Sequence, residues 1–207
     1  MAYKLYYADG SASMCVRVIL EELDQPYELI VVDISSEGLS NPNLLKKNPN
    51  GWIPVLTWEK GSIYECGAIV VFLCDRHSAL KLAPNFNHTN RGLYLQWLFF
   101  FSSSLQTAYQ MTYRSERFCS SVSEYYIIKE RAITRLGELW KIVDCSIGKN
   151  EWLLGDHFSS VDIYLFMLTT WLSKDDGHPK IQDFPNVCRI AEQVKKRRSV
   201  QNVYQVT

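Results

Sequence analysis

The chain has 207 residues, of which 47% are hydrophobic, and its 22 basic and 22 acidic residues give a formal net charge of zero. This composition is enough for one large or two small globular domains with a sizeable core. The balanced charge gives no electrostatic basis for binding nucleic acid or an anionic membrane, and apolar runs such as residues 97–101 are far too short to cross a bilayer.

Six cysteines and four histidines are scattered at irregular spacing, without a CxxC, an HxxxH or a mixed Cys/His pair. The N-terminal stretch MAYKLYYADG lacks the apolar segment of a signal peptide. We therefore expect a cytoplasmic protein with reduced thiols and no bound metal.

The first half of the sequence alternates predicted strands and helices. Residues 4–8 and 27–33 are strand candidates, and residues 13–23 place apolar side chains at helical spacing. A short helix is expected at 41–47. Successive β-α-β segments imply a parallel pair of strands.

The stretch NPNGWIPVLTW, residues 48–58, begins with a turn signal because Asn and Gly tolerate positive φ. A strand follows from Ile53. Pro54 must lie at the first residue or at an edge of that strand, because proline cannot donate a ladder hydrogen bond. We expect the peptide bond before Pro54 to be cis, a form that usually has a structural purpose.

A hairpin turn is expected at 59–62, followed by a short strand at 63–64. A helix then opens at Glu65 and Cys66, where an acid suits the helix dipole. The order of elements in the first half is therefore β-α-β-α-β-β-α.

Strand signals vanish beyond residues 82–85, a Pro- and Asn-bearing segment. Four stretches are predicted helices: 91–113, 123–147, 159–172 and 187–196. Ser159 and Asp162 have the spacing of a capping box. The basic run at 195–198 is expected to be the solvated end of the last helix, where the dipole favours cations.

Three stretches resemble, in this order, motifs of the cytosolic glutathione transferases: NPNGWIPVL at 48–56, ECGAI at 65–69 and FSSVDI at 158–163. The resemblance covers essentially the whole chain. It implies an α/β plus all-α fold: a thioredoxin-like βαβαββα domain over residues 1–80, a linker over 81–86, and an all-helical domain over 87–207 that carries the electrophile site.

The class that the chain resembles is bacterial-like and serine-type (theta- or zeta-like). A cysteine-type member would need its cysteine at Ala12, so the sequence does not support mixed-disulfide chemistry. A disulfide oxidoreductase is disfavoured for the further reason that there is no CxxC.

The resemblance implies a glutathione site. In the family, the backbone at the Ile53 position, just before Pro54, pairs with the cysteinyl part of glutathione as an added strand would. Glu65, Cys66 and the helix-opening amides hold the γ-glutamyl end, since a helix N-terminus suits a carboxylate and Glu65 can accept from the ammonium.

The family reaction needs a glutathione thiolate, although a free thiol has a pKa of about 8.5. Ser11 is the predicted hydroxyl donor to the sulfur, at the start of the first helix. Ser13 is either nearby through its hydroxyl or backbone, or the N-cap of that helix. Tyr6 and Tyr7 are alternative donors, because tyrosine serves in other classes.

Two departures from the family pattern weaken the predicted site. Cys66 replaces the usual serine, and a thiol is a weaker hydrogen-bond partner. Trp52 stands where a lysine or glutamine commonly reaches the glycyl carboxylate, and Leu39 and Ser40 offer no cation. Each lost contact to a charged group costs about 1.5–3 kcal/mol.

The second substrate is expected to be a small apolar electrophile, with Tyr109, Tyr113 and Arg114 as candidate contacts. The predicted function is conjugation of glutathione to that electrophile, as in detoxification, or a related glutathione-dependent reduction. The alternative is a non-catalytic binding or regulatory protein on the same fold. The resemblance also implies a homodimer, with Arg76 as a candidate interface charge.

Overall fold

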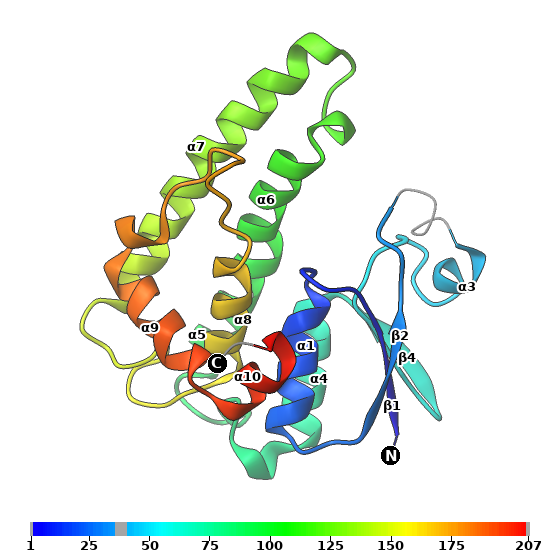
Figure 1. The fold of residues 1–207 in the computed structure, drawn as a ribbon. Helices are drawn as coiled ribbons and strands as arrows, with labels where there is room; N and C mark the ends of the chain where they lie inside the picture. Colours follow the sequence, from blue (N-terminus) through cyan, green and yellow to red (C-terminus); the bar gives the residue numbers. More distant parts are fainter. Residues whose placement is uncertain (1, 36–40, 206–207) are drawn as a thin grey trace. The chain divides into compact units, whose positions relative to one another are not determined.

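The computed structural model describes residues 2–35 and 41–205. The chain forms two compact units, which can be followed by their colours in Figure 1. The sheet unit comprises Met1–His88 and Lys195–Thr207, and the helical unit comprises Thr89–Val194. Among the residues described, no helix combines the length and the apolar character needed to span a membrane.

The sheet unit is built on a mixed sheet with the strand order β2-β1-β3-β4. Its strands are β1 (Tyr3–Tyr7), β2 (Tyr27–Val31), β3 (Val55–Trp58) and β4 (Gly61–Tyr64). β1 and β2 are parallel, and β3 is antiparallel to both β1 and β4. The predicted parallel pair and hairpin are confirmed.

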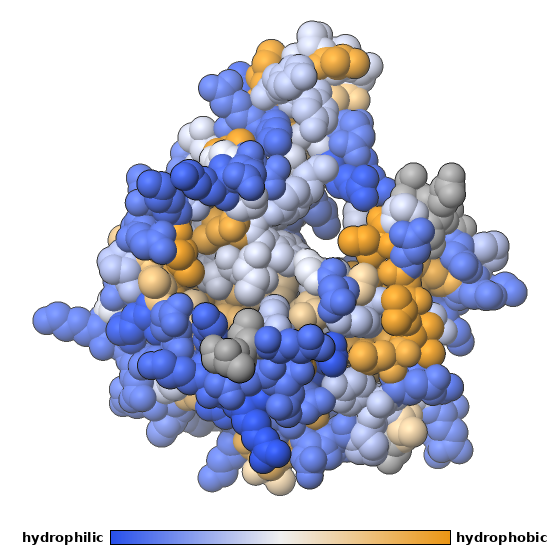
Figure 2. Space-filling model, viewed as in Figure 1, coloured by the Kyte–Doolittle hydropathy of each residue, from blue (hydrophilic) through white to orange (hydrophobic). Residues whose placement is uncertain are grey.

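β2 is an edge strand with an apolar outer surface. Val31, its last residue, is 78% exposed, and Ile34 beyond it is also exposed. Figure 2 shows hydrophobic surface gathered over this side of the sheet unit. β2 is shorter than predicted, and a short edge strand limits the surface on which another chain can pair.

Two helices, α1 (Ser13–Glu22) and α4 (Cys66–Arg76), pack against each other and against the sheet. Alternate residues of a strand point to the same face. The odd-numbered residues of β1 are accordingly all buried: Tyr3, Leu5 and Tyr7. The unit also contains a 3-10 turn at Ser78–Leu80 and the C-terminal helix α10 (Arg198–Tyr204).

The other face of the sheet has a smaller core. Val55 is paired with Tyr6 across β1 and β3, so both side chains lie on this face. Leu44, from α3 (Pro42–Leu45), packs on Val55, and Tyr6, Val32, Trp52 and Ile53 surround this pair.

The helical unit contains no strand among the residues described, as the sequence predicted. Its helices are α5 (Arg91–Phe99), α6 (Gln106–Tyr113), α7 (Val122–Ile147), α8 (Ser160–Thr169) and α9 (Pro185–Lys195). Shorter 3-10 turns occur at Ser115–Arg117 and Ile181–Asp183. The two-part fold confirms the predicted thioredoxin-like and all-helical classes.

The predicted capping box at the start of α8 is confirmed. Asp162 accepts hydrogen bonds from the Ser159 amide at 2.8 Å and the Ser159 hydroxyl at 3.1 Å, and also from the Leu153 amide at 2.9 Å. Every residue of α8 is buried. Burial outweighs these hydrogen bonds and raises the pKa of Asp162 to about 6.

The prediction of one continuous helix over 91–113 is wrong in one respect. A π-helical turn, Phe100–Leu105, separates α5 from α6. Within it, the Ser102 hydroxyl donates to the Leu98 carbonyl at 2.9 Å, and the Ser103 hydroxyl donates to the Phe99 carbonyl at 2.7 Å. Serine hydroxyls that bond to the preceding turn compete with the regular helical pattern.

The interpretation of residues 195–198 as the solvated end of the last helix is right for Lys195, which is exposed in the last turn of α9, but wrong in two respects. A further helix, α10, follows, and Arg197 immediately precedes it. Arg197 donates from Nε and Nη2 to the two carboxylate oxygens of Glu22 on α1, at 2.7 and 2.8 Å, and the Ser199 hydroxyl donates to the same carboxylate at 2.5 Å. These contacts hold α10 against α1.

Candidate functional site

Strand topology brings three predicted segments to the same end of the sheet, where β1 and β4 end and β3 begins. Val55 is paired with Tyr6 on one side and with Tyr64 on the other. Because β3 is antiparallel to both neighbours, its start lies beside the ends of β1 and β4. Three segments therefore lie at this end of the sheet: the loop after β1, the Ile53–Pro54 bond, and Glu65 with Cys66.

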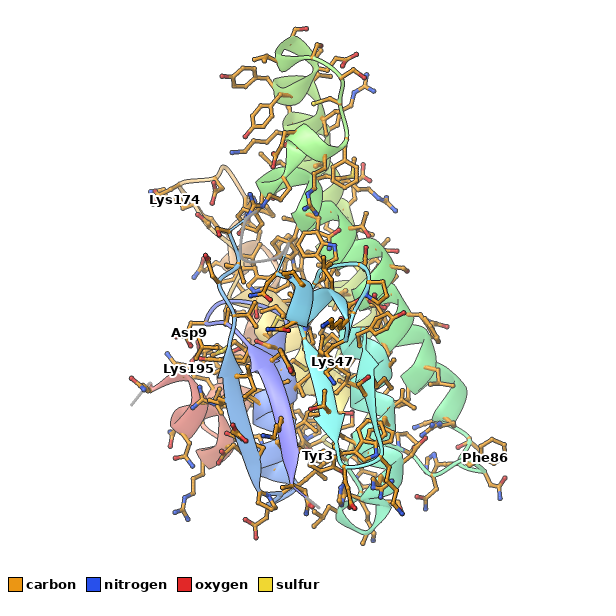
Figure 3. The ribbon with its side chains drawn as sticks, turned by 90° about the vertical axis from the view of Figure 1, so that its right-hand side faces the viewer. Tyr3, Asp9, Lys47, Phe86, Lys174 and Lys195 are labelled. Atoms are coloured by element: carbon orange, nitrogen blue, oxygen red, sulfur yellow. The ribbon has the colours of Figure 1, made fainter. Side chains whose placement is uncertain are left out.

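The Ser11 loop, residues 8–13, joins β1 to α1. Figure 3 shows Asp9, in this loop, at the opposite end of β1 from Tyr3. The Ser11 side chain is partly exposed. Its hydroxyl donates to the Ala8 carbonyl at 2.8 Å and lies 2.6 Å from the Ser13 hydroxyl. The predicted donor is therefore at the start of α1 with accessible surface.

Ser13 is not the N-cap of α1, so that alternative is wrong. Ala12 occupies the N-cap position, and it has helical φ and ψ and no side-chain cap. Ser13 is the first helical residue and is completely buried. Its hydroxyl points back toward Ala8, where it contacts both the amide nitrogen at 3.2 Å and the carbonyl oxygen at 3.1 Å.

The Ile53–Pro54 peptide bond is cis, as predicted. The turn before it is organised by Asn48, a buried residue whose Oδ1 accepts from the Asn50 amide and whose Nδ2 donates to the Trp52 carbonyl at 2.8 Å. The side chain of Trp52 packs against the Leu44–Val55 core. Leu39 and Ser40 lie outside the described residues.

Glu65 and Cys66 form the start of α4. Glu65 is exposed and has φ +72°, a backbone conformation that is uncommon for a residue with a side chain. Cys66 is buried, and its thiol donates to the Ala12 carbonyl at 3.5 Å. The Cys66 side chain therefore faces the Ser11 loop, while its amide is among the helix-opening N–H groups that lack an intrahelical partner.

A second buried thiol lies next to Cys66. Burial, together with a hydrogen bond to the Cys66 thiol, raises the pKa of Cys15 well above its usual range. A thiol with a raised pKa is a poor nucleophile at neutral pH. Cys15 is therefore a packing residue of α1.

The hydroxyl of Tyr7 is already engaged. It donates to the carboxylate of Asp9 and accepts from Arg17 Nη1 at 3.1 Å, and the Arg17 guanidinium lies 5.3 Å from the Tyr7 ring centroid. Tyr6 lies on the other face of the sheet, with the Leu44–Val55 core. Sequence reasoning missed Asp9 and Arg17, because only the folded chain places them around Tyr7.

The candidate electrophile contacts lie on or just beyond α6. Tyr109 is completely buried: its hydroxyl donates to the Leu168 carbonyl at 2.9 Å and accepts from Trp140 Nε1 at 3.1 Å. Tyr109 therefore has no exposed surface for a ligand, and the prediction that it could face the substrate is not supported by its position. Arg114 lies 3.9 Å from the Glu116 carboxylate.

Tyr113 is 42% exposed, and its hydroxyl donates to the Trp171 carbonyl at 2.5 Å. Partial burial, with the charge of Asp176, raises its pKa to about 12. His178, which the sequence did not single out, lies edge-on to Tyr113 with ring centroids 5.3 Å apart and bonds to the Thr112 hydroxyl at 3.0 Å.

Comparisons with known proteins agree with this architecture. Two family models match the chain: the N-terminal domain of glutathione S-transferases over residues 5–81 and the C-terminal domain over residues 108–197. Glutathione S-transferase GST-4.5 from Xanthomonas campestris pv. campestris is 26% identical over 171 residues, which make up 83% of this chain and 83% of that protein.

Two solved structures are similar over almost the whole chain. BphK, described as a bacterial GST in a ternary complex, has a TM-score of 0.84 and 28% identity, covering 98% of each chain. A glutathione transferase homolog from Sulfitobacter with bound glutathione has a TM-score of 0.90 and 24% identity, covering 99% of this chain and 97% of that one. Because matched models account for both of its halves, the chain belongs to the glutathione S-transferase family, and we identify it as a glutathione transferase.

Proposed function

We propose that the protein conjugates reduced glutathione to a small apolar electrophile by attack of the glutathione thiolate, and that it is a serine-type enzyme. The observation that carries the proposal is Ser11, a partly exposed residue whose hydroxyl lies at the start of α1. It lies at the end of the sheet where the Ile53–Pro54 segment and the start of α4 also lie. A hydroxyl donor and a helix N-terminus together favour a thiolate.

Glutathione is proposed to bind at this end of the sheet. The Ile53 backbone, next to the cis bond, pairs with the cysteinyl part of the peptide. The γ-glutamyl carboxylate meets the amides that open α4, and Glu65 accepts from the γ-glutamyl ammonium. Cys66 contributes its amide rather than its thiol, since the thiol is bonded to the Ala12 carbonyl.

Two features of the site bear on affinity. The inward thiol of Cys66 means that the serine-to-cysteine difference removes a hydroxyl contact but leaves the backbone contact. Trp52 packs on the Leu44–Val55 core, and its neutral indole provides no charge for the glycyl carboxylate. We therefore propose weak glutathione binding.

The electrophile is proposed to meet Tyr113 and Arg114 in the helical unit. Tyr113 offers exposed ring surface to an apolar substrate, and Arg114 offers a guanidinium to an anionic substituent. Tyr109 is left out of this proposal because it is buried.

The enzyme is proposed to act as a cytoplasmic homodimer. Arg76, an exposed residue in the last turn of α4, lies over the Phe72 ring at 5.7 Å from its centroid and is a candidate for the interface. Sedimentation at micromolar concentration should give twice the chain mass of 24.0 kDa. A single 24.0 kDa species would refute the dimer.

The function is tested by calorimetric titration with glutathione, followed by a conjugation assay with a generic aryl halide. The matched pair of variants is Ser11→Ala in the loop and Ser199→Ala in α10, a buried serine that bonds to Glu22 outside the proposed site. We expect binding and turnover in the native protein and in Ser199→Ala, with turnover at neutral pH reduced roughly ten- to a hundredfold in Ser11→Ala. Glutathione binding without turnover of any electrophile would instead support the non-catalytic alternative.

A further inference from the structure

Three oxygens of the Ser11 loop form a closed triangle. The Ser11 hydroxyl oxygen is 2.8 Å from the Ala8 carbonyl oxygen, the Ser13 hydroxyl oxygen is 3.1 Å from that carbonyl, and the two hydroxyl oxygens are 2.6 Å apart. The triangle holds only two hydrogens, because a carbonyl oxygen has none. One of its three contacts therefore always lacks a hydrogen, and more than one arrangement of the hydrogens is available.

Two backbone amides hold the hydroxyl oxygens in place. The Ala8 amide donates to the Ser13 hydroxyl oxygen at 3.2 Å, and the Ser13 amide donates to the Ser11 hydroxyl oxygen at 3.2 Å. These bonds use acceptor positions and leave both hydroxyl hydrogens free to rotate. The hydrogens can therefore exchange partners without displacement of the heavier atoms.

The available arrangements differ in which serine hydroxyl donates a hydrogen bond to the Ala8 carbonyl. In one, Ser11 donates to the carbonyl and Ser13 donates to Ser11. In another, Ser13 donates to the carbonyl, so the Ser11 hydrogen is no longer needed there. A thiolate next to Ser11 favours the second arrangement, because a hydrogen bond to an ionised acceptor is stronger than one to a neutral acceptor.

We propose that Ser13 is a positioning residue that takes over the Ala8 carbonyl and so releases the Ser11 hydroxyl to the glutathione sulfur. This inference rests on the proposed role of Ser11. Ser13 is completely buried and acts only through Ser11. No bond is made or broken and no proton leaves the loop; two hydroxyl hydrogens change acceptors.

The consequence appears when the Ser13 hydroxyl is removed. The Ala8 carbonyl and the thiolate then compete as acceptors for a single hydroxyl hydrogen, that of Ser11. The remaining bond to that carbonyl within the loop is from the Ser11 amide, at a long 3.3 Å. Donation to the sulfur now leaves a buried carbonyl poorly satisfied, which disfavours the thiolate.

The test is a pH titration of the bound thiol, followed by the ultraviolet absorbance of the thiolate. Protein with S-methylglutathione, which cannot ionise at sulfur, is the blank that removes the absorbance of the protein's own cysteines and tyrosines. We expect Ser13→Ala to raise the pKa of the bound thiol by about 0.5–1 unit, the size of one neutral hydrogen bond. Ser11→Ala should raise it by about 1–2 units, since it removes a charge-assisted bond.

Turnover supplies a second readout. Below the thiol pKa, turnover by Ser13→Ala should fall by about three- to tenfold, in proportion to the thiolate fraction, and should recover at alkaline pH. Ser199→Ala, which also removes a buried hydroxyl from the sheet unit, should titrate like the native protein. A merely structural Ser13 would lower stability without moving either pH profile.

The inference is overturned if Ser13→Ala titrates like the native protein while Ser11→Ala shifts. A flat response of both variants, or a native bound thiol no more acidic than free glutathione, would remove the proposed role of Ser11, and with it this inference. If Ser13→Ala does not fold, Ser13→Cys retains a similar volume with a weaker donor. It should then show a smaller shift in the same direction, and an unshifted Ser13→Cys counts against the proposal.

Discussion

The Ser11 loop of the sheet unit and the aromatic cluster of the helical unit (Tyr109, Tyr113, Trp171 and His178) use their polar groups in opposite ways. In the loop, three oxygens share two hydrogens, so one hydroxyl can change partners. In the cluster, the buried Tyr109 hydroxyl has one donor and one acceptor and no access to a ligand. A hydroxyl is available for chemistry only where its present bond can be replaced at little cost.

The largest effect is expected when buried hydrogen bonds of the helical unit are removed, because these bonds cannot be replaced as those of the Ser11 loop can. Asp162→Ala removes the acceptor of three hydrogen bonds at the start of α8 and leaves buried donors unsatisfied. We expect the free energy of unfolding to fall by about 3 kcal/mol or more, as measured by denaturant titration. Asp162→Asn, which keeps one acceptor oxygen, should lose less. Equal losses in both variants would show that backbone adjustments, not unsatisfied donors, set the effect.

The next largest effect is expected in the loop. Ser11→Ala removes a charge-assisted bond of about 1.5–3 kcal/mol, so turnover at neutral pH should fall roughly ten- to a hundredfold. The pH profile of turnover should shift to alkaline values, and glutathione affinity should change less. Full activity in Ser11→Ala, combined with loss of activity in Tyr6→Phe or Tyr7→Phe, would assign the donor to a tyrosine.

A smaller effect is expected where α10 meets α1. Although burial opposes ionisation of Glu22, hydrogen bonds from Arg197 and Ser199 lower its pKa overall. Arg197→Ala should destabilise the protein at pH 7 by about 1 kcal/mol, a figure that allows for solvent screening of a partly exposed arginine. Thermal unfolding at several ionic strengths measures this loss, which high salt should reduce.

The pH dependence of the Glu22 and Asp162 carboxylates should have opposite signs. Because the pKa of Glu22 is lowered by folding, its stabilisation is present above its unfolded pKa and is lost as the pH falls through the folded value. The pKa of Asp162 is raised to about 6, so folding stability from that group decreases as the pH rises from about 4 to 6. The effect of Arg197→Ala should therefore vanish in acid, and persistence of the full effect there would contradict the ion pair.

The smallest effect is expected from Tyr113→Phe. Its hydroxyl bond to the Trp171 carbonyl is partly exposed, so we expect a loss of about 0.5 kcal/mol and an unchanged pKa of the bound thiol. Tyr109→Phe is the matched control, and it should cost more because Trp140 Nε1 is left buried without its acceptor. A tenfold loss of turnover in a stable Tyr113→Phe would mean that its hydroxyl acts on the substrate.

Local patterns in the sequence were sufficient for most elements of the fold. The proline after Ile53 and the box at Ser159 and Asp162 depend on residues a few positions apart, and the structure contains both features as predicted. The Ser102 and Ser103 bonds that accompany the π-helical turn are also local, but the apolar pattern around them is that of an ordinary helix.

Features that depend on distant contacts were not predictable in the same way. Arg197 and Glu22 are 175 positions apart, so the basic run around Arg197 looked like a solvated helix end. The burial of Tyr109 depends on Trp140 and Leu168, which lie on other helices. The role of Ser13 depends on the direction of a single hydroxyl, which points back to Ala8 instead of capping α1.

The return of the C-terminal segment to α1 has a consequence for biosynthesis. The ribosome makes Met1–His88 before the helical unit and Lys195–Thr207 after it. Domains of a nascent chain generally fold in the order in which they emerge. Here the first unit to emerge stays incomplete until the helical unit has been made, because Arg197 and Ser199 follow that unit in the chain. A ribosome-stalled chain that ends before residue 195 would contain the complete helical unit. Its sheet unit would lack α10, and Glu22 would lack its ion-pair partner Arg197.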